Sequence, residues 1–435
     1  MASTKKVGVH SPLFQSIGTL LTGKSFAFII ALVLTPVIAR LFTPEHFGVL
    51  AIFLAMANVL GSVASLRYER AIALPRRDAQ AMQLAWLSLG LLVGACSGIT
   101  ALLVAVRFAG VELLIIEKIG LWAWALPFAV FIIGLISILE IWLIRTRQFH
   151  SIAFSDATGA LLTGSSRVSF GVASGSSVGG LIVGLLIGKL GRILLLLRAT
   201  VRNNSNLSKR ITSGTVKQLL SEYRDFPAYN APSVFFRSLS NQLPVLVFGV
   251  VFSPLAAGFY AMAERVVRMP LVKVASVIRR VYVQKLAEDM NGHKSLKSAV
   301  LGATGLMFAV ALLPVTLLSL YGEATLAFVL GEQWRPAGLL VEIIVPWLLL
   351  VWTALPASSA LLVLREQLLW LRFQFTLMIL RLLMFGIGIL LSLSMEATLS
   401  LFVWASVVSY MYIIAHALWL VERDDLGKCT PSSSV

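Results

Sequence analysis

Basic side chains inside apolar stretches are the residues of this chain that could do chemistry. At membrane depth we expect seven basic residues against three acidic ones. They are Lys24, Arg167, Arg237, Arg265, Arg268, Lys273 and Arg381 against Asp156, Glu264 and Glu342. Each charge at membrane depth costs about 2.5 to 3.5 kcal/mol on insertion scales, so it needs a partner or a water-filled cavity. The excess of four cations predicts a cationic interior suited to an anionic cargo, because guanidinium groups bind phosphate oxygens in a bidentate way.

Two arginines share one face of a predicted helix. Arg265 and Arg268 are three residues apart, which places them on the same side of a helix, and both suit the phosphates of a lipid diphosphate. Glu264 and Arg268 are four residues apart and can pair along the helix. The alternative is an ion pair internal to the helix, with Lys273 extending toward the headgroups.

Two further positions lie deep in apolar stretches. Arg237, Asn241 and Gln242 form a polar stripe on one helix, which suits sugar hydroxyls; hydrogen bonding between helices in lipid is the alternative. Lys24 lies roughly midway along the first apolar stretch, too deep to reach either surface easily. We expect Lys24 to face a cavity.

Asp156 and Glu264 are the residues that could couple transport to an ion. A carboxylate with reduced solvation, or beside a cation, can be tuned to bind and release a proton, although such acids also serve as plain salt-bridge partners. The chain shows no nucleophile elbow, phosphate-binding loop or His-rich cluster, and it holds only two cysteines, Cys96 and Cys429. We therefore expect no enzymatic activity, no cofactor and no metal site.

The composition is that of a membrane protein. Of 435 residues, 58% are hydrophobic and 13% charged, and the mean hydropathy is +0.88. The net charge of +16 would suggest nucleic acid in a soluble protein, but here the basic residues lie between apolar runs. They are read as topology signals, and no nucleic-acid partner is expected.

Twelve apolar stretches are long enough to span a bilayer, which takes about 20 residues of helix. They cover residues 13–39, 47–66, 82–106, 120–144, 151–173, 178–197, 233–252, 256–277, 299–320, 338–364, 373–393 and 397–421. The fifth is diluted by Gly, Ser, Asp156 and Arg167, and the eighth is interrupted by four charges. The prediction is an all-α integral membrane protein.

The loops fix an orientation, because Lys and Arg are retained on the cytoplasmic side during insertion. One set of loops carries nineteen Lys and Arg residues and the other carries four. Both termini are therefore expected in the cytoplasm, which requires an even number of spans. The stretch from 198 to 225 is basic and polar, and is expected to be a solvated linker near anionic headgroups.

A repeated sequence motif indicates that the chain is divided into two lobes. Phe42-Thr43-Pro44, Gly48 and Ala51 recur as Phe252-Ser253-Pro254, Gly258 and Ala261, at an offset of 210. Coincidence is one explanation, since such turns are common; the other is a duplicated six-helix unit, a known plan of transporters. The expected organisation is an N-lobe of spans 1–6 (1–200), a basic cytoplasmic linker (201–231), a C-lobe of spans 7–12 (232–421) and a polar tail (422–435).

Several segments of the chain resemble one known family of membrane proteins. Residues 40–48 (RLFTPEHFG) with 66–75 (LRYERAIALP) carry the most specific similarity. Residues 223–227 (YRDFP), 331–335 (GEQWR) and 346–348 (PWL) are similar to that family too. The family is that of the bacterial polysaccharide flippases, the Wzx-like branch of the multidrug/oligosaccharidyl-lipid/polysaccharide (MOP) exporter superfamily.

The resemblance implies two six-helix lobes around a central cavity that carries undecaprenyl-diphosphate-linked oligosaccharide outward. It places Lys24, Arg237, Glu264, Arg265 and Arg268 in that cavity. Its cytoplasmic mouth is then formed by three consecutive residues, Arg67, Tyr68 and Glu69.

We expect a flippase of the bacterial inner membrane that serves surface polysaccharide biosynthesis. Its partners would be the lipid-linked oligosaccharide, the phospholipid bilayer, a polysaccharide polymerase and other assembly proteins. Three alternatives remain: a multidrug antiporter of the same superfamily, which would need buried acids; a membrane polymerase or glycosyltransferase, which would need a larger outer loop; and a non-transporting scaffold.

Overall fold

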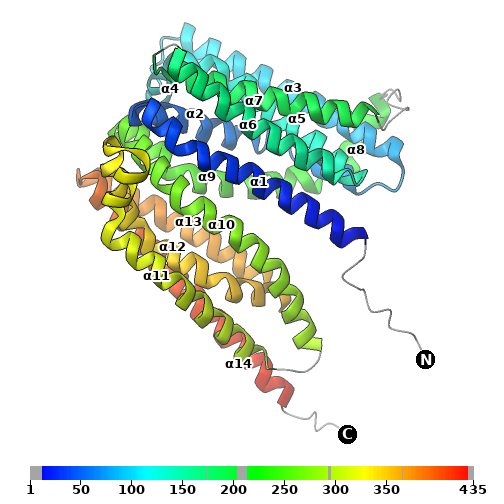
Figure 1. Cartoon of the computed structure of the whole chain (residues 1–435). Helices are drawn as coiled ribbons and strands as arrows, with labels where there is room; N and C mark the ends of the chain where they lie inside the picture. The colour runs from blue at the N-terminus through cyan, green and yellow to red at the C-terminus, as the bar shows by residue number, and fades with distance from the viewer. Residues whose placement is uncertain (1–11, 174, 203–212, 292–294, 365, 430–435) are drawn as a thin grey trace. The chain divides into compact units, whose positions relative to one another are not determined.

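The computed structural model describes residues 12–173, 175–202, 213–291, 295–364 and 366–429, and the regular structure in these ranges is helical (Figure 1). The long helices are α1 (Pro12–Leu41), α2 (Pro44–Gly61), α3 (Asp78–Phe108), α5 (Leu126–Arg145), α6 (Phe149–Ala173), α7 (Val178–Arg202), α9 (Ala231–Val247), α10 (Pro254–Asn291), α11 (Leu296–Leu330), α12 (Arg335–Val363), α13 (Gln367–Leu390) and α14 (Met395–Cys429). The shorter ones are η1 (Tyr68–Ala73), α4 (Leu114–Ile119), η2 (Gly120–Ala125), α8 (Ser213–Glu222), η3 (Phe226–Asn230), η4 (Phe248–Phe252) and η5 (Glu332–Trp334).

Each of the twelve predicted spans coincides with one long helix, so the prediction of an all-α multi-pass membrane protein is confirmed. In the described ranges, nine helices are long and apolar enough to cross a membrane. The stretches with the weakest signal, the fifth and the eighth, became α6 and α10, which are not among the nine. Their charges lower the mean hydropathy without preventing a helix of membrane length.

The chain divides into two compact units, Met1–Gly258 (unit 1) and Phe259–Val435 (unit 2). The division falls within α10, so that helix begins in unit 1 and continues into unit 2. Unit 1 therefore includes α9, the seventh span, which the sequence had assigned to the second lobe. The expected boundaries at 200, 231 and 421 stay a prediction.

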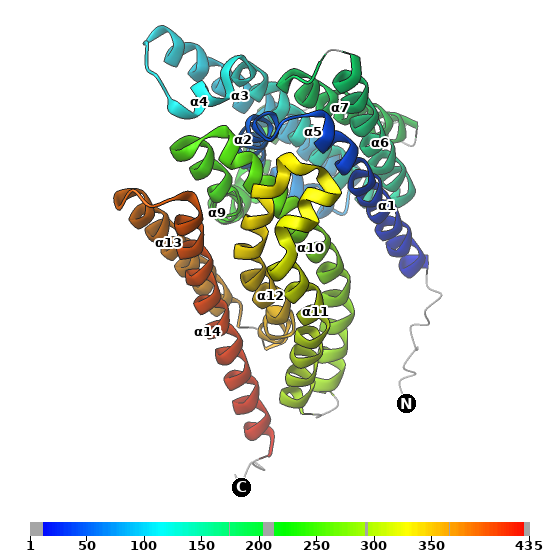
Figure 2. The same cartoon turned by 60° about the vertical axis from the view of Figure 1, so that its left-hand side comes forward.

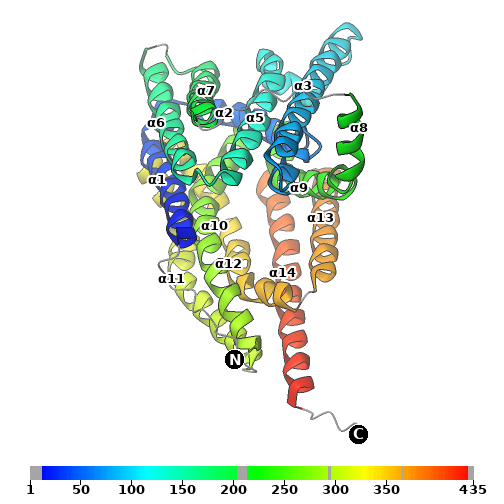
Figure 3. The ribbon, with the colours of Figure 1, turned by 90° about the vertical axis from the view of Figure 1, so that its right-hand side faces the viewer.

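Glycines let two helices of unit 1 approach closely. Figure 3 shows α6 beside α7, and Gly180, Gly184 and Gly188 recur every fourth residue on the side of α7 that faces α6. A Cβ atom on Gly188 would lie 1.9 Å from Thr163 Oγ1, so a larger residue does not fit. Small residues at such spacing are how membrane helices pack tightly. This packing, together with the approach of Gly164 and Gly171 to α1 and the residue after it, accounts for many of the glycines of the fifth and sixth spans.

The two copies of the repeated motif fold alike. Thr43 caps α2, where its Oγ1 accepts a hydrogen bond from His46 N at 3.3 Å. Ser253 does the same at the start of α10, where its Oγ accepts from Ala256 N at 3.1 Å. In both copies a proline follows the capping residue, the helix position at which its missing N–H costs least.

The copies also cross each other inside unit 1. A Cβ atom on Gly48 would lie 1.6 Å from the carbonyl oxygen of Pro254, and one on Gly258 would lie 1.9 Å from that of Pro44. The proline carbonyl of each copy thus lies against the glycine of the other copy. This reciprocity is the pattern expected across a two-fold axis and supports duplication over coincidence.

Part of the expected linker packs against unit 1. Leu219 on α8 is buried in a hydrophobic cluster that includes Ile72 and Leu84. The Tyr68 hydroxyl donates to Leu220 O at 3.2 Å, which ties α8 to η1. The expectation of a wholly solvated linker was therefore wrong for α8. Leucine side chains at consecutive positions 219 and 220 outweigh the polar composition around them.

In unit 2, α11 lies beside α12 and α13 beside α14 (Figure 2). Helix α11 is kinked at Tyr321, whose φ and ψ are −130° and 21°. A kink frees backbone N–H groups that lipid cannot satisfy. The Glu342 side chain of α12 accepts from Glu323 N at 3.2 Å, just after the kink. Glu342, an acid at membrane depth, thus accepts a hydrogen bond from the backbone of α11.

Candidate functional site

Arg67 is held in place by a set of polar contacts in unit 1. Leu66 and Arg67 both have positive φ (50° and 65°), and the chain turns there into η1. Arg67 Nη1 lies 3.2 Å from Glu69 Oε1, and Arg67 Nε donates to Asn230 Oδ1 at 3.2 Å. Glu69 is only 2% exposed and also accepts from Ser65 Oγ at 2.6 Å. The guanidinium is therefore aimed by a buried carboxylate.

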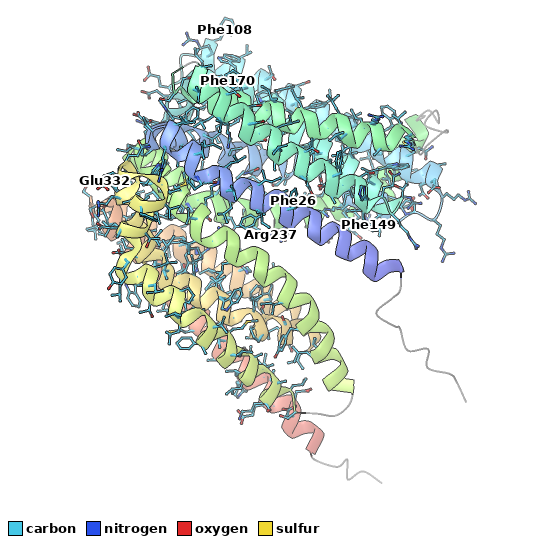
Figure 4. The ribbon with its side chains drawn as sticks, in the orientation of Figure 1. Phe26, Phe108, Phe149, Phe170, Arg237 and Glu332 are labelled. Atoms are coloured by element: carbon cyan, nitrogen blue, oxygen red, sulfur yellow. The ribbon has the colours of Figure 1, made fainter. Side chains whose placement is uncertain are left out.

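Arg237 lies close enough to Arg67 for their charges to interact. The pKa of Arg67 is lowered first by its removal from water; Glu69 opposes this, while Arg70 and Arg237 lower it further. Arg237 is exposed on α9, where Figure 4 labels it. Arg67, proposed at the mouth, and Arg237, proposed in the cavity, thus both belong to unit 1, and Asn230, the partner of Arg67, precedes Arg237 by about two helical turns.

Tyr68 and Glu69 have supporting positions. Tyr68 is 2% exposed, and its hydroxyl is committed to Leu220 O. Burial raises the pKa of Tyr68, since the phenolate would be removed from water. In this structure Glu69 positions Arg67, whereas Tyr68 ties η1 to α8, and both side chains are buried.

The expected pair on the eighth span forms within unit 2. The Arg268 guanidinium pairs with Glu264 one turn earlier and also lies 5.9 Å from the centre of the Trp347 ring. Arg265 is partly buried on the same helix. The side chain of Lys24 lies outside the described residues, although its backbone belongs to α1.

A second arginine lies in the packed interior of unit 2. Arg381 on α13 is 5% exposed, and its guanidinium stacks 5.0 Å from the Trp347 ring centre and 4.7 Å from that of Phe402. Its Nε donates to Ser406 Oγ at 3.0 Å. Aromatic faces attract cations, most strongly where water is excluded. Arg381 therefore links α12, α13 and α14.

Sequence reasoning missed three charges that gather in unit 1. Glu140 lies within the predicted span 120–144, and Lys189 and Arg192 lie within 178–197, yet none had been counted. Arg192 Nη2 pairs with Asp156 Oδ1 at 2.5 Å and also with Glu140 Oε1. Including them raises the excess of intramembrane cations from four to five. Simple inspection of the predicted spans would have found all three.

Arg167 packs against α7 at its glycine stripe. It is 4% exposed, its Nε donates to Leu181 O at 3.0 Å, and a Cβ on Gly184 would meet its side chain at 2.7 Å. It contributes a buried positive charge to the same three helices, α5, α6 and α7, that hold Arg192 and its carboxylates.

The fold is that of known membrane transporters. A lipid II flippase, MurJ, in an inward closed conformation matches 94% of this chain and 90% of its own, with a TM-score of 0.69 and 11% sequence identity. An inward-facing multidrug resistance MATE transporter of the MOP superfamily matches 93% of this chain and 94% of its own (TM-score 0.64, 16% identity). A MOP superfamily transporter from Pyrococcus furiosus, described by a reversed polarity of its binding pocket, matches 97% and 99% (TM-score 0.54, 16% identity).

These likenesses define an integral membrane protein with the MATE- and MurJ-like fold over nearly the whole chain. Residues 37–338 match the polysaccharide biosynthesis protein family, so the chain belongs to that family. No curated protein matches the sequence. The resemblance seen in the sequence is confirmed.

Proposed function

We propose that the protein is a flippase that moves undecaprenyl-diphosphate-linked oligosaccharide from the cytoplasmic to the periplasmic leaflet of the bacterial inner membrane. Both termini then lie in the cytoplasm, and the product serves a surface polysaccharide such as O-antigen, capsule or exopolysaccharide. Family membership and the MurJ-like fold are consistent with this activity.

The observation that carries the proposal is Arg67, which Glu69 and Asn230 hold in place next to the start of α9, the helix that carries Arg237 about two turns farther on. A diphosphate presents two phosphate groups, and a guanidinium can take one phosphate in a bidentate way. Buried Glu69 and exposed Asn230 hold Arg67 in place, so little side-chain entropy is lost when the anion binds. Lys24, Arg265 and Arg268 are proposed as further cationic contacts for the diphosphate and the first sugars.

The carboxylates argue against a cationic drug as cargo. Glu140 and Asp156 are engaged by Arg192, and Glu264 by Arg268. A drug-carrying antiporter would need such acids available for its cationic cargo. Asp156 and Glu264 thus remain proposals for ion coupling, each acting through an arginine partner.

The test is complementation in the native host after deletion of the gene. Lipid-linked oligosaccharide is measured in each leaflet for the wild type, Arg237→Ala and the control Arg335→Ala. Arg335 is an exposed arginine whose Nε pairs with Glu332 at 2.5 Å, outside the predicted site. Loss of one guanidinium–phosphate contact, about 1.5 to 3 kcal/mol, should weaken capture about 10- to 100-fold.

The expected result is accumulation on the cytoplasmic side with Arg237→Ala and normal distribution with Arg335→Ala at equal membrane abundance. Normal leaflet distribution in the deletion strain would refute the flippase, and altered drug resistance there would favour the multidrug antiporter. Loss of polymer length with normal leaflet distribution would point to a polymerase.

A further inference from the structure

Arg381 carries a full positive charge in the packed interior of unit 2, at membrane depth. It lies on α13, roughly 21 Å from the start of the helix and roughly 14 Å from its end at 1.5 Å per residue. It forms no ion pair with any residue that the structure describes. Arg268, which also contacts the Trp347 ring, is paired with a carboxylate of its own, Glu264. The charge of Arg381 therefore needs compensation from another source.

The contacts of this guanidinium leave one of its nitrogens without an acceptor. Nε donates to Ser406 Oγ at 3.0 Å, and the guanidinium carbon lies 5.0 Å from the ring centre of Trp347 and 4.7 Å from that of Phe402. Nη2 is buried and has no hydrogen-bond partner among the described residues. The attraction between a cation and an aromatic ring is smaller than the penalty for burying an ion, so two rings and one hydroxyl compensate this charge only in part.

Trp347 adds a second unpartnered donor, on the side chain that stacks against Arg381. The indole Nε1 can only donate, and it is buried without an acceptor among the residues that the structure describes. Trp352, on the same helix, shows the usual arrangement, because its Nε1 donates to Met307 O at 3.1 Å. Buried donors are almost always hydrogen-bonded. Two orphaned donors on one stacked pair of side chains therefore indicate an acceptor that the described residues do not supply.

The charge and the packing around these donors select a small anion. Water can accept from both N–H groups but leaves the guanidinium charge uncompensated, whereas an anion satisfies the donors and the charge together. The neighbouring side chains of Phe402 and Ser406 are fully buried, and Trp347 and Arg381 are nearly so. An interior packed this densely accommodates a single atom more readily than a phosphate group with its ester substituents. A halide is a single-atom acceptor of this kind.

We propose that Arg381 and Trp347 together bind one halide-sized anion, such as chloride, inside unit 2. The anion accepts hydrogen bonds from Arg381 Nη2 and Trp347 Nε1 and neutralises the guanidinium. Trp347 belongs to α12, Arg381 to α13 and its other partner Ser406 to α14, so the bound anion strengthens the contact among three helices. The inference concerns unit 2 alone and does not depend on the cargo of the proposed flippase.

The first experiment measures chloride binding to the purified full-length protein in detergent. The protein is dialysed into sodium gluconate, whose anion is too large for the site, and radioactive chloride is then added at constant ionic strength. The wild type should bind a single chloride per chain, and its thermal midpoint should rise by a few degrees, because the anion binds only the folded state. Bromide should displace the bound chloride, whereas inorganic phosphate should not.

Trp347→Phe tests the indole donor, because it keeps an aromatic ring beside Arg381 and removes the N–H. It should weaken chloride binding about 10-fold, the effect of losing one hydrogen bond to a charged group. The matched control is Trp352→Phe, which removes an indole N–H of the same helix that already has a protein acceptor. That control should lower the thermal midpoint in gluconate and in chloride alike, and it should keep the wild-type affinity for chloride.

Arg381→Met tests the charge, because it replaces the guanidinium with an apolar side chain. It should abolish chloride binding, and its thermal midpoint in gluconate should equal or exceed that of the wild type, since no buried charge is left to compensate. The matched control is Arg423→Met, which removes an exposed arginine that lies 5.9 Å from the ring centre of Trp419. The control should bind chloride as the wild type does.

Three results would overturn the anion site. A wild type that binds no chloride and has the same thermal midpoint in gluconate and in chloride would assign both donors to water. Chloride binding that persists unchanged in Trp347→Phe and Arg381→Met would place the anion elsewhere in the protein. Displacement of chloride by phosphate would contradict a halide-sized site. If Arg381→Met does not fold, the chloride affinity of Trp347→Phe relative to Trp352→Phe still decides.

Discussion

Replacing Gly48 or Gly258 with alanine should destabilise the folded protein far more than the addition of one methyl group usually does. The added Cβ would lie 1.6 or 1.9 Å from a proline carbonyl oxygen, whereas ordinary contacts begin near 3.4 Å. One helix start must therefore withdraw by about 1.5 Å, in an interior as densely packed as a crystal. The obstacle is backbone and not a flexible side chain, so it cannot move alone. We expect each substitution to lower the free energy of unfolding by about 3 kcal/mol, the upper end of the range for overpacking.

The assay is thermal unfolding of the purified protein in detergent. Gly305→Ala on α11 is the matched control, because nothing lies within 4 Å of a Cβ built there. That variant should be neutral or more stable, since alanine favours a helix by about 1 kcal/mol over glycine.

The double variant sharpens the test. Both glycines lie at the same helix crossing, so the first alanine already separates the two helix starts. The second alanine should therefore lower the free energy of unfolding by less than the first. Single variants that unfold like Gly305→Ala, or two costs that add fully, would refute the reciprocal crossing.

Three further outcomes follow from single contacts. Glu342→Leu should destabilise unit 2 by about 1 to 3 kcal/mol, because Glu323 N loses its acceptor at the α11 kink, while Glu342→Gln should keep most of the stability; thermal unfolding checks both. Leu219→Asp should release α8, seen as faster hydrogen exchange across residues 213–222 with exchange in α13 unchanged; equal protection in wild type and variant would contradict the docking. Trp347→Leu removes one of the two rings that stack on Arg381 and should lower stability by about 1 to 2 kcal/mol more than Leu349→Ala, a neighbour outside that stack.

Hydropathy was sufficient to predict the number and the positions of the long helices. All twelve spans were found because each helix must bring about 20 apolar residues into lipid, whatever its neighbours are. The twofold organisation was visible at Pro44 and Pro254, because a helix start has a local signature of cap, proline and glycine. The kink at Tyr321 falls where the ninth predicted span ended, at residue 320, but the continuation of α11 beyond it to Leu330 was not predicted.

The site was harder to predict because charge partners depend on which helices meet. The pair Glu264 and Arg268 was predictable, since both lie on one helix, four residues apart. The partners of Arg192 come from two other helices, and nothing in the spacing of a single helix specifies them. Likewise, Arg67 and its partner Asn230 are 163 positions apart in sequence, so only the folded unit brings them together.

The crossing of Gly48 and Gly258 also bears on ancestry. In a symmetric dimer of one six-helix polypeptide, a single glycine would serve both sides of the axis, and any mutation there would strike the interface twice. If the chain arose by fusion of two copies of such a gene, that one position became two that can mutate separately, although each keeps its value only while the other persists. Descendants should therefore retain both glycines or replace both, and a half-protein expressed alone should seek a second copy of itself.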